Sequence, residues 1–215
     1  NGFKALKICV ARYPGCVAAY GLHPLCLMEA GEGDIATLRD WIIAENPVAV
    51  GEIGLDHYLA DVDRTRQEWF FVEQLKLARE FNLPVILHVR QAIDPVLKQL
   101  RRFKPKGGIA HAFNGSRQQA DEFIKLGFKL GFGGAMTYRG STRIRELASS
   151  LPLESIVLET DAPDIPPPWL NRGRNAPAEL ARIATVLADL RGIPLAEVTA
   201  ATTANAVATF PALLR

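Results

Sequence analysis

Four short apolar runs along the chain each lead into a carboxylate or a histidine. Such uninterrupted apolar runs are typical of parallel strands that are buried on both faces. In an α/β protein the carboxyl ends of parallel strands form the edge of the sheet at which active sites are built. We therefore expect these four strand ends to carry the chemistry of the protein. They are Val48–Val50 with Glu52, Val85–Leu87 with His88, Gly108–Ala110 with His111, and Ile156–Leu158 with Asp161.

Helical patterns alternate with these strands. Phe3, Leu6 and Val10 recur at helical spacing near the start of the chain, which predicts an amphipathic helix. Asp34 is the expected N-cap of the next helix, and Ser116 opens a capping box. Two further strands, at residues 17–20 and 129–134, bring the expected number to six. The expected helices cover residues 3–13, 34–45, 67–81, 93–103, 116–126, 141–150, 177–191 and 195–210.

Strict alternation of helix and strand predicts parallel strands joined by right-handed crossovers. A closed barrel brings ligand residues from non-adjacent strands to one mouth. An open dinucleotide-binding sheet would instead need a glycine-rich phosphate loop, and Gly51–Gly54 does not have that pattern. We therefore expect a TIM-type (β/α)8 barrel, with residues 1–215 forming a single barrel domain. Six strands fall short of eight, so we expect the first two strands to be absent from this chain.

The composition narrows the possible classes of protein. The chain has 215 residues, 48% of them hydrophobic, and a net charge of +2. This is enough for one domain with a substantial core, and the charge indicates neither a nucleic-acid nor a membrane partner. No apolar run approaches the 18 or so residues of a membrane span, and no signal peptide pattern is present. Three cysteines without C-x-x-C spacing predict free thiols in a reducing, cytoplasmic compartment.

Imidazole and carboxylate groups together suit Zn²⁺, Mn²⁺ or Fe²⁺, and Mg²⁺ where carboxylates dominate. A single histidine at such a position is more often a hydrogen-bonded, partly buried side chain, but His88, His111, Glu52 and Asp161 together favour a metal site. Asp161 is the preferred ligand or base. Glu159 could instead be a buried group that orients its neighbours, and this role is as well supported as that of a ligand.

Other residues near the strand ends have either a structural or a functional interpretation. His23 either caps the turn before Pro24 or contacts the substrate, and His57 is expected to be a solvated loop residue. Arg90 and Arg174 follow strands and suit phosphate oxygens, although arginines are also common at solvated helix starts. The glycines at 131–134 favour tight packing of a strand over a phosphate cradle.

Short motifs in order along nearly the whole chain resemble the TatD family of metal-dependent deoxyribonucleases, within the amidohydrolase-like barrel superfamily. The run Gly133–Tyr138 is similar to the YjjV-like branch of that family. The motifs are Gly21–Pro24, Gly51–Asp56, Gln74–Ala78, Pro84–His88, His111–Gly115, Glu159–Pro163, Arg174–Pro177 and Thr203–Asn205.

The resemblance implies a (β/α)8 barrel that holds divalent ions, most simply two, as Mg²⁺, Mn²⁺ or Zn²⁺. By the same resemblance Glu52 bridges two ions, His88 and His111 hold one of them, and Asp161 holds the other and helps to activate water. The family's first strand carries a His-x-His pair, and this sequence has no such pair. Its absence agrees with the expectation that the first two strands are not in the chain.

The leading hypothesis is therefore a metal-dependent 3′→5′ exodeoxyribonuclease that acts on single strands or 3′ ends of DNA. Glu52 and Asp161 are the expected catalytic residues, and His23, Arg90 and Arg174 are the expected substrate contacts. No membrane and no obligate protein partner are expected. The alternatives are a hydrolase of a small amide or ester, and a catalytically silent barrel that acts as a binding module.

Overall fold

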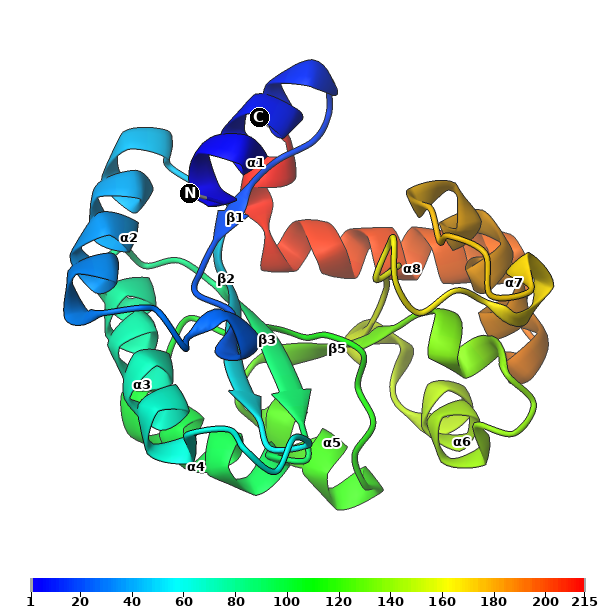
Figure 1. Cartoon of the computed structure of the whole chain (residues 1–215). Helices are drawn as coiled ribbons and strands as arrows, with labels where there is room; N and C mark the ends of the chain where they lie inside the picture. Colours follow the sequence, from blue (N-terminus) through cyan, green and yellow to red (C-terminus); the bar gives the residue numbers. More distant parts are fainter. Residues whose placement is uncertain (1, 215) are drawn as a thin grey trace. The chain divides into compact units, whose positions relative to one another are not determined.

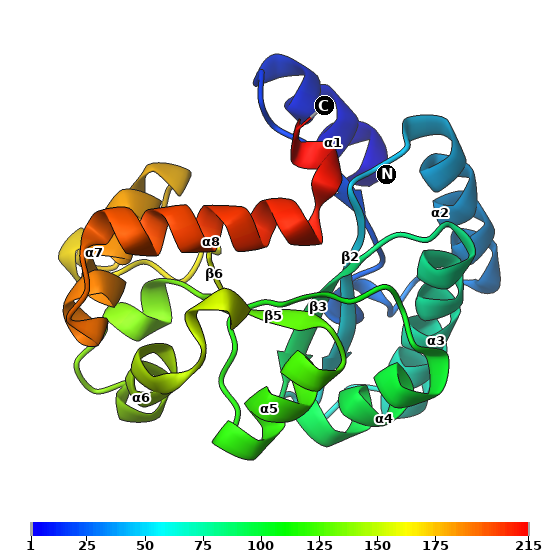
Figure 2. The same cartoon turned by 180° about the vertical axis from the view of Figure 1, so that it is seen from behind.

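The computed structural model describes residues 2–214, which form two compact units (Figures 1 and 2). Unit 1 comprises the residues up to Gly108 together with those from Phe210 onward, and unit 2 comprises Ile109–Thr209. The described residues contain six strands, as the sequence pattern predicts. None of the helices within residues 2–214 has the length and apolar character needed to cross a membrane.

Unit 1 is built around three parallel strands in the order β1-β2-β3. Helices α2, α3 and α4 lie next to one another along these strands (Figure 1). Its helices are α1 (Gly2–Arg12), α2 (Glu32–Glu45), α3 (Arg64–Glu80) and α4 (Ile93–Phe103), with 3-10 turns η1 (Pro24–Cys26) and η6 (Pro211–Leu214). Its strands are β1 (Ala19–Tyr20), β2 (Ala49–Asp56) and β3 (Val85–Arg90).

The core of unit 1 follows from the apolar faces of these elements. Helix α4 buries Val96, Leu97 and Leu100 at helical spacing, and Val50 and Ile53 of β2 are completely buried. Each such side chain contributes about 1.5–3 kcal/mol when it leaves water. This packing holds β2 rigidly, which matters because β2 carries Glu52.

The strand that was expected to end at Glu52 continues to Asp56, and the strand expected to end at His88 continues to Arg90. The end predicted in β2 was wrong because Gly51 and Gly54 interrupt the apolar run without ending the strand, and β3 continues beyond His88 because Val89 and Arg90 pair with Leu55 and Asp56 of β2. A Cβ atom added to Gly51 would lie 2.6 Å from Ile86 Cβ, and one added to Gly54 would overlap the carbonyl oxygen of His88. The glycines therefore allow β2 and β3 to approach closely.

Two helix starts in unit 1 also differ from the prediction. Helix α2 begins at Glu32, and Gly31 is its N-cap. Asp34 lies inside the first turn, where its carboxylate accepts a hydrogen bond from the Gly31 N–H at 2.7 Å. Helix α3 starts three residues earlier than expected, because Asp63 caps it by accepting the Arg66 N–H at 2.9 Å. In both cases a carboxylate satisfies backbone N–H groups that the first turn leaves unpaired.

Unit 2 contains the parallel pair β5-β6 and the helices that pack on it. Helices α7 and α8 lie side by side (Figure 2), and Asn205 of α8 donates hydrogen bonds to the carbonyl oxygens of Leu153 and Ile156 at 2.9 and 2.7 Å. Its helices are α5 (Arg117–Lys125), α6 (Thr142–Ser150), α7 (Leu180–Arg191) and α8 (Leu195–Thr209), with 3-10 turns η2 (Gly134–Thr137), η3 (Leu153–Ser155), η4 (Pro168–Leu170) and η5 (Pro177–Glu179). Its strands are β5 (Phe128–Phe132) and β6 (Ile156–Leu158), and β4 (Gly108–Ala110) spans the boundary residue.

The capping box predicted at Ser116 is confirmed. Its hydroxyl accepts the Gln119 N–H at 3.1 Å, and the Gln119 side chain accepts the Ser116 N–H at 3.0 Å. Strand β6, by contrast, ends at Leu158 instead of Asp161. The chain turns directly after that point, with the Asp164 N–H donating to the Asp161 carbonyl oxygen at 2.6 Å. Glu159 and Asp161 are therefore loop residues that follow a strand.

Candidate metal site

In unit 1 the structure brings together His23, Glu52 and His88, with one possible ligand atom from each lying within 4.8 Å of the others. His23 Nε2 lies 3.1 Å from His88 Nδ1 and 3.4 Å from Glu52 Oε2. Two ligand atoms bound tetrahedrally to one Zn²⁺ at about 2.1 Å lie about 3.4 Å apart. The spacing of this cluster is therefore that of groups that share a divalent ion.

Neighbouring strands position two members of the cluster. Glu52 lies in the middle of β2 and His88 lies on β3, and the register of these parallel strands pairs Gly54 with His88. The side chain of Glu52 is 31% exposed, although Gly51 and Ile53 on either side of it are buried. The buried neighbours hold the backbone in place, and the carboxylate of Glu52 is partly exposed to solvent beside His23.

His88 is oriented by a buried carboxylate that the sequence analysis did not single out. His88 Nε2 lies 2.9 Å from Asp56 Oδ2, and the side chain of Asp56 has no exposed surface. Asp56 Oδ1 accepts the Tyr58 N–H at 3.0 Å, and the Asp56 N–H donates to Gln67 at 3.0 Å. Carboxylates that hold a histidine in this way fix its ring and leave the other nitrogen for a metal. The available signal was the place of Asp56 directly after an apolar stretch of the chain, at the end of β2.

In unit 2 His111 directly follows β4, and its ligand nitrogen lies within 4.8 Å of a carboxylate oxygen of Asp161. Glu159 has a different environment. Its Oε1 accepts the Ala112 N–H at 2.8 Å and lies 3.9 Å from His111 Nδ1. A Cβ atom added to Gly131 would overlap the Glu159 carboxylate. Glu159 thus packs against the backbone of Ala112 and Gly131, and the absence of a side chain at Gly131 leaves space for its carboxylate.

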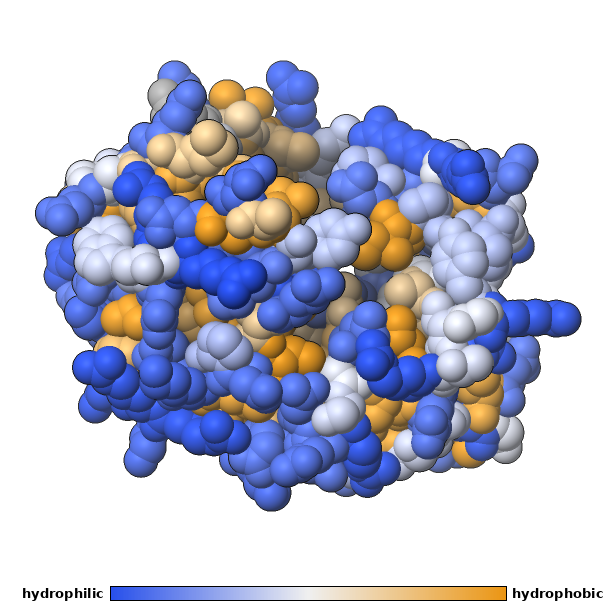
Figure 3. Space-filling view, turned by 60° about the horizontal axis from the view of Figure 1, so that its bottom comes forward, coloured by the Kyte–Doolittle hydropathy of each residue, from blue (hydrophilic) through white to orange (hydrophobic). Residues whose placement is uncertain are grey.

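The two arginines expected to bind substrate are both exposed. The guanidinium of Arg90, at the end of β3, lies 3.6 Å from the centre of the Tyr58 ring. Arg174 precedes Asn175, whose buried side chain donates to the carbonyl oxygen of Asp164 at 2.8 Å. Hydrophilic residues predominate on the face toward which β2 and β3 run (Figure 3). Such a surface suits a charged ligand.

The loop position predicted for His57 is confirmed, but the residue is less solvated than expected. Its ring is only partly exposed, and Nε2 is buried with no hydrogen-bond partner within residues 2–214. Burial lowers the pKa of His57 below its usual 6.5, and the nearby Arg64 acts in the same direction. No local pattern in the sequence predicts this partial burial, because it depends on residues of α3 and α4 that line the same pocket.

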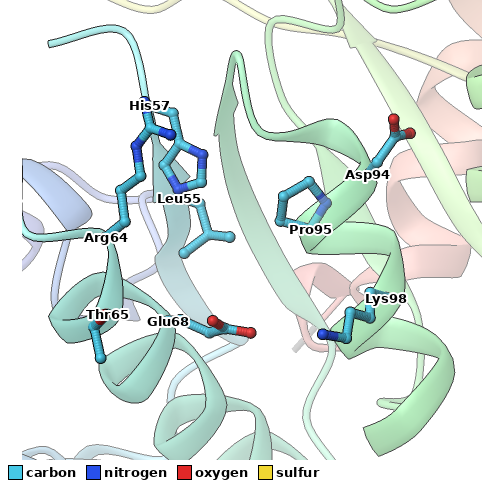
Figure 4. Close-up of a pocket in the computed structure, with 8 residues that line it drawn as sticks. All are labelled: Leu55, His57, Arg64, Thr65, Glu68, Asp94, Pro95 and Lys98. Atoms are coloured by element: carbon cyan, nitrogen blue, oxygen red, sulfur yellow. The ribbon is translucent and has the colours of Figure 1, made fainter. Parts of the chain in front are cut away.

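His57 belongs to a pocket of about 420 Å³ that is separate from the metal cluster (Figure 4). Side chains alternate along a strand, so Leu55 lies on the opposite face of β2 from Asp56, and His57 directly follows the strand. The pocket opens between the first turns of α3 and α4. Its lining residues are Leu55, His57, Arg64, Thr65, Glu68, Asp94, Pro95 and Lys98.

The family described as TatD related DNase matches residues 1–211 of the chain. The chain is 41% identical over 214 residues to the protein named uncharacterized metal-dependent hydrolase YjjV of Escherichia coli K12, covering 98% of this chain and 82% of that protein. It is 36% identical to the protein named 3′-5′ ssDNA/RNA exonuclease TatD of Cronobacter sakazakii, covering 93% of this chain and 78% of that protein.

Solved structures agree with the sequence comparisons. The crystal structure of the YjjV protein from E. coli K12 superposes with a TM-score of 0.90 at 39% identity, covering 96% of this chain and 82% of the other. The predicted family and the predicted (β/α) barrel fold class are thereby confirmed. This chain belongs to the TatD family of metal-dependent hydrolases.

Proposed function

We propose that the protein hydrolyses phosphodiester bonds of DNA and removes nucleotides from 3′ ends of single strands. The observation that carries this proposal is the set of Glu52, His88 and Asp56, in which a buried carboxylate orients a histidine beside a second carboxylate. The name of the C. sakazakii relative as a single-strand exonuclease supports the same substrate class.

The proposed ligands of the divalent ions are Glu52 and His88 of unit 1 and His111 and Asp161 of unit 2. Imidazole nitrogens and carboxylate oxygens suit Mn²⁺ and Zn²⁺, and carboxylates also suit Mg²⁺. We propose that the protein binds two ions, and Glu52 would be one of the residues that hold them. Bound ions of this kind lower the pKa of water and neutralise charge on a phosphoryl group.

The side chains have distinct proposed roles in the reaction. Asp161 would accept the proton of the attacking water. Glu52 would help to hold the ions that position this water. Arg90 and Arg174 bind phosphate oxygens through charge-assisted hydrogen bonds. Arg90 is already stacked on the ring of Tyr58, so less side-chain freedom is lost when it binds phosphate.

The decisive experiment compares Glu52→Gln with the wild type on a 5′-labelled single-stranded oligonucleotide in Mg²⁺ or Mn²⁺. Glutamine keeps the shape of the side chain but removes the charge that attracts cations. We expect kcat to fall by about 10²–10³-fold or more, with an unchanged circular dichroism spectrum. Glu146→Gln, at an exposed position on α6, is the matched control and keeps full activity.

A Glu52→Gln variant that remains active with added Mg²⁺ would contradict the proposed mechanism. Hydrolysis of small esters or amides by the wild type, without release of nucleotides, would instead favour the amidohydrolase alternative. We also propose a cytoplasmic location, because Cys9, Cys16 and Cys26 are exposed free thiols that suit a reducing compartment.

A further inference from the structure

Tyr58 lies in the loop that directly follows β2, and hydrogen bonds fasten this loop to two strands that carry members of the metal cluster. The Tyr58 N–H donates to Asp56 Oδ1 at 3.0 Å, and the preceding His57 N–H donates to the carbonyl oxygen of Arg90 at 2.9 Å. The other oxygen of Asp56, Oδ2, lies 2.9 Å from His88 Nε2. One buried carboxylate therefore holds Tyr58 close to a residue of the cluster.

The ring of Tyr58 is also held in place. The guanidinium carbon of Arg90 lies 3.6 Å from the centre of the ring, which is the geometry of a cation stacked on an aromatic face. Tyr58 nevertheless keeps 53% of its surface exposed. Because the guanidinium covers one face of the ring, this exposure comes mainly from the opposite face and from the edge.

The loop that follows β1 begins within the cluster and adds exposed apolar side chains. Gln67 of α3 joins this loop to the end of β2, because its amide donates to the carbonyl oxygen of Pro24 at 3.3 Å and accepts the Asp56 N–H at 3.0 Å. Leu25 and Met28 of the loop are 42% and 93% exposed. The surface beside the cluster is therefore partly apolar, which suits the uncharged part of a ligand.

An exposed aromatic ring in a fixed position is suited to bind a flat ligand by stacking. Ordering a mobile side chain on binding costs free energy, and the contacts of Tyr58 with Asp56 and Arg90 already order it. Aromatic faces stack on other flat π-systems whatever hydrogen-bonding groups those carry. The exposed face of Tyr58 therefore offers a site for a flat aromatic group close to the metal cluster.

We propose that Tyr58 binds a nucleobase of the substrate by stacking, with Arg90 on the other face of its ring. This inference rests on the proposed function, because single-stranded DNA supplies both the base and the phosphates beside it. The guanidinium of Arg90 presents N–H groups at its edge to a phosphate while its face stays on Tyr58. Every base has a π-face, so the contact requires a base but no particular sequence. A base within a duplex is paired and stacked on its neighbours, so the site favours single strands.

Substrates that lack one base test this contact. Each of a series of 5′-labelled single strands carries one abasic residue, at the first, second or third position from the 3′ end. For the wild type we expect kcat/KM to fall by about 5–100-fold at one of these positions. Tyr58→Ala should lose a similar factor on the complete strand and lose little more when that base is absent. Tyr58→Phe keeps the ring and should retain the wild-type preference for the complete strand.

A purely structural role for Tyr58 has a different signature. If Tyr58 only supported Arg90, Tyr58→Ala would lower kcat/KM equally on complete and abasic strands, because both contain the phosphates. An equal ratio of the two kcat/KM values in the wild type and in Tyr58→Ala would therefore overturn the inference. Tyr13→Ala is the matched control, since Tyr13 follows α1, is 60% exposed and should leave both values unchanged when replaced.

Binding without turnover separates this inference from the proposed function. Single strands with phosphorothioate linkages, which resist hydrolysis, carry the fluorescent base 2-aminopurine at one of the same positions and a dye at the 5′ end. We expect stacking to quench 2-aminopurine in the wild type but not in Tyr58→Ala, whose Kd, measured by anisotropy of the dye, should rise by about 5–100-fold.

The possible outcomes are distinct. A wild type that shows this quenching but leaves an unmodified strand intact would contradict the proposed function and support the stacking site. Hydrolysis by the wild type, with the same 2-aminopurine fluorescence in Tyr58→Ala, would support the proposed function and overturn the stacking site. A wild type that neither binds nor hydrolyses the strands would overturn both.

Discussion

At the scale of single residues, the site depends on polar groups that are buried but paired. Asp56 is the clearest case, since its carboxylate has no exposed surface and accepts from both His88 and the Tyr58 backbone. An unpaired buried carboxylate would be strongly unfavourable, so these partners explain why an apolar strand can end in an aspartate. The same pairing holds the His88 ring in an orientation that turns Nδ1 toward His23.

We expect Asp56→Asn to weaken Mn²⁺ binding by about 10–100-fold, because the amide no longer provides a charged acceptor for the His88 N–H. Isothermal titration calorimetry measures the affinity. Asp121→Asn is the control, since Asp121 lies on the surface of α5 and pairs with Arg117 one turn away. Equal affinities for wild type and Asp56→Asn would show that Asp56 does not orient His88 for metal binding.

His57 should make folding stability depend on pH. Burial lowers the pKa of His57 in the folded protein below the 6.5 of an unfolded chain. Between these two values the unfolded state binds more protons, so the free energy of unfolding falls as pH drops below about 6.5 and levels off below the folded pKa. Urea unfolding between pH 5 and 8 should therefore show a smaller decrease for His57→Gln than for the wild type. Parallel pH profiles of the two proteins would rule out this contribution.

At the scale of elements, glycines decide how closely strands and loops can approach. In β2 they allow contact with β3, and in β5 Gly131 leaves the space that the Glu159 carboxylate occupies. Side chains at these positions would force neighbouring backbone or a hydrogen-bonded carboxylate to move. The glycines thus support the site, although none of them carries a functional group.

Gly131→Ala should destabilise the protein by about 1–3 kcal/mol, as overpacking usually does, because its methyl group would displace the Glu159 carboxylate from Ala112. Chemical denaturation measures the change. Gly140→Ala is the matched control, because a Cβ atom there meets nothing within 4 Å, and its stability should change by less than about 0.5 kcal/mol. A neutral Gly131→Ala substitution would mean that Glu159 has room to shift.

At the scale of the whole molecule, membership of a metal-dependent family links stability to metal binding. A ligand that binds only the folded state stabilises it by about 2.7 kcal/mol when present at 100 times its Kd. EDTA-treated protein should therefore show a rising Tm as Mn²⁺ is added, measured by scanning calorimetry. His88→Ala should show a much smaller rise. A wild-type Tm that is independent of Mn²⁺ would contradict metal binding by the folded chain.

Much of the fold was predictable because its signals are local. The helix at residues 93–103 was predicted with both ends correct, since apolar residues repeat at helical spacing there. The capping box at Ser116 depends on only four consecutive residues. His88 and His111 were recognised as candidate ligands because each closely follows a short apolar run. Motif order along the chain was sufficient to identify the family.

The tertiary structure alone decided features that join residues distant in sequence. Asp56 meets His88 only because β2 and β3 pair in this register, and His57 is partly buried only because residues of α3 and α4 line the same pocket. The position of His23 likewise depends on a turn held by Gln67 and Gln74 from α3. Local periodicity determines which segments become helices and strands, whereas strand register and helix packing determine which polar atoms face one another. Local patterns were therefore sufficient to predict the family, the alternating elements and the candidate ligands, whereas the orientation of those ligands depends on contacts between distant segments.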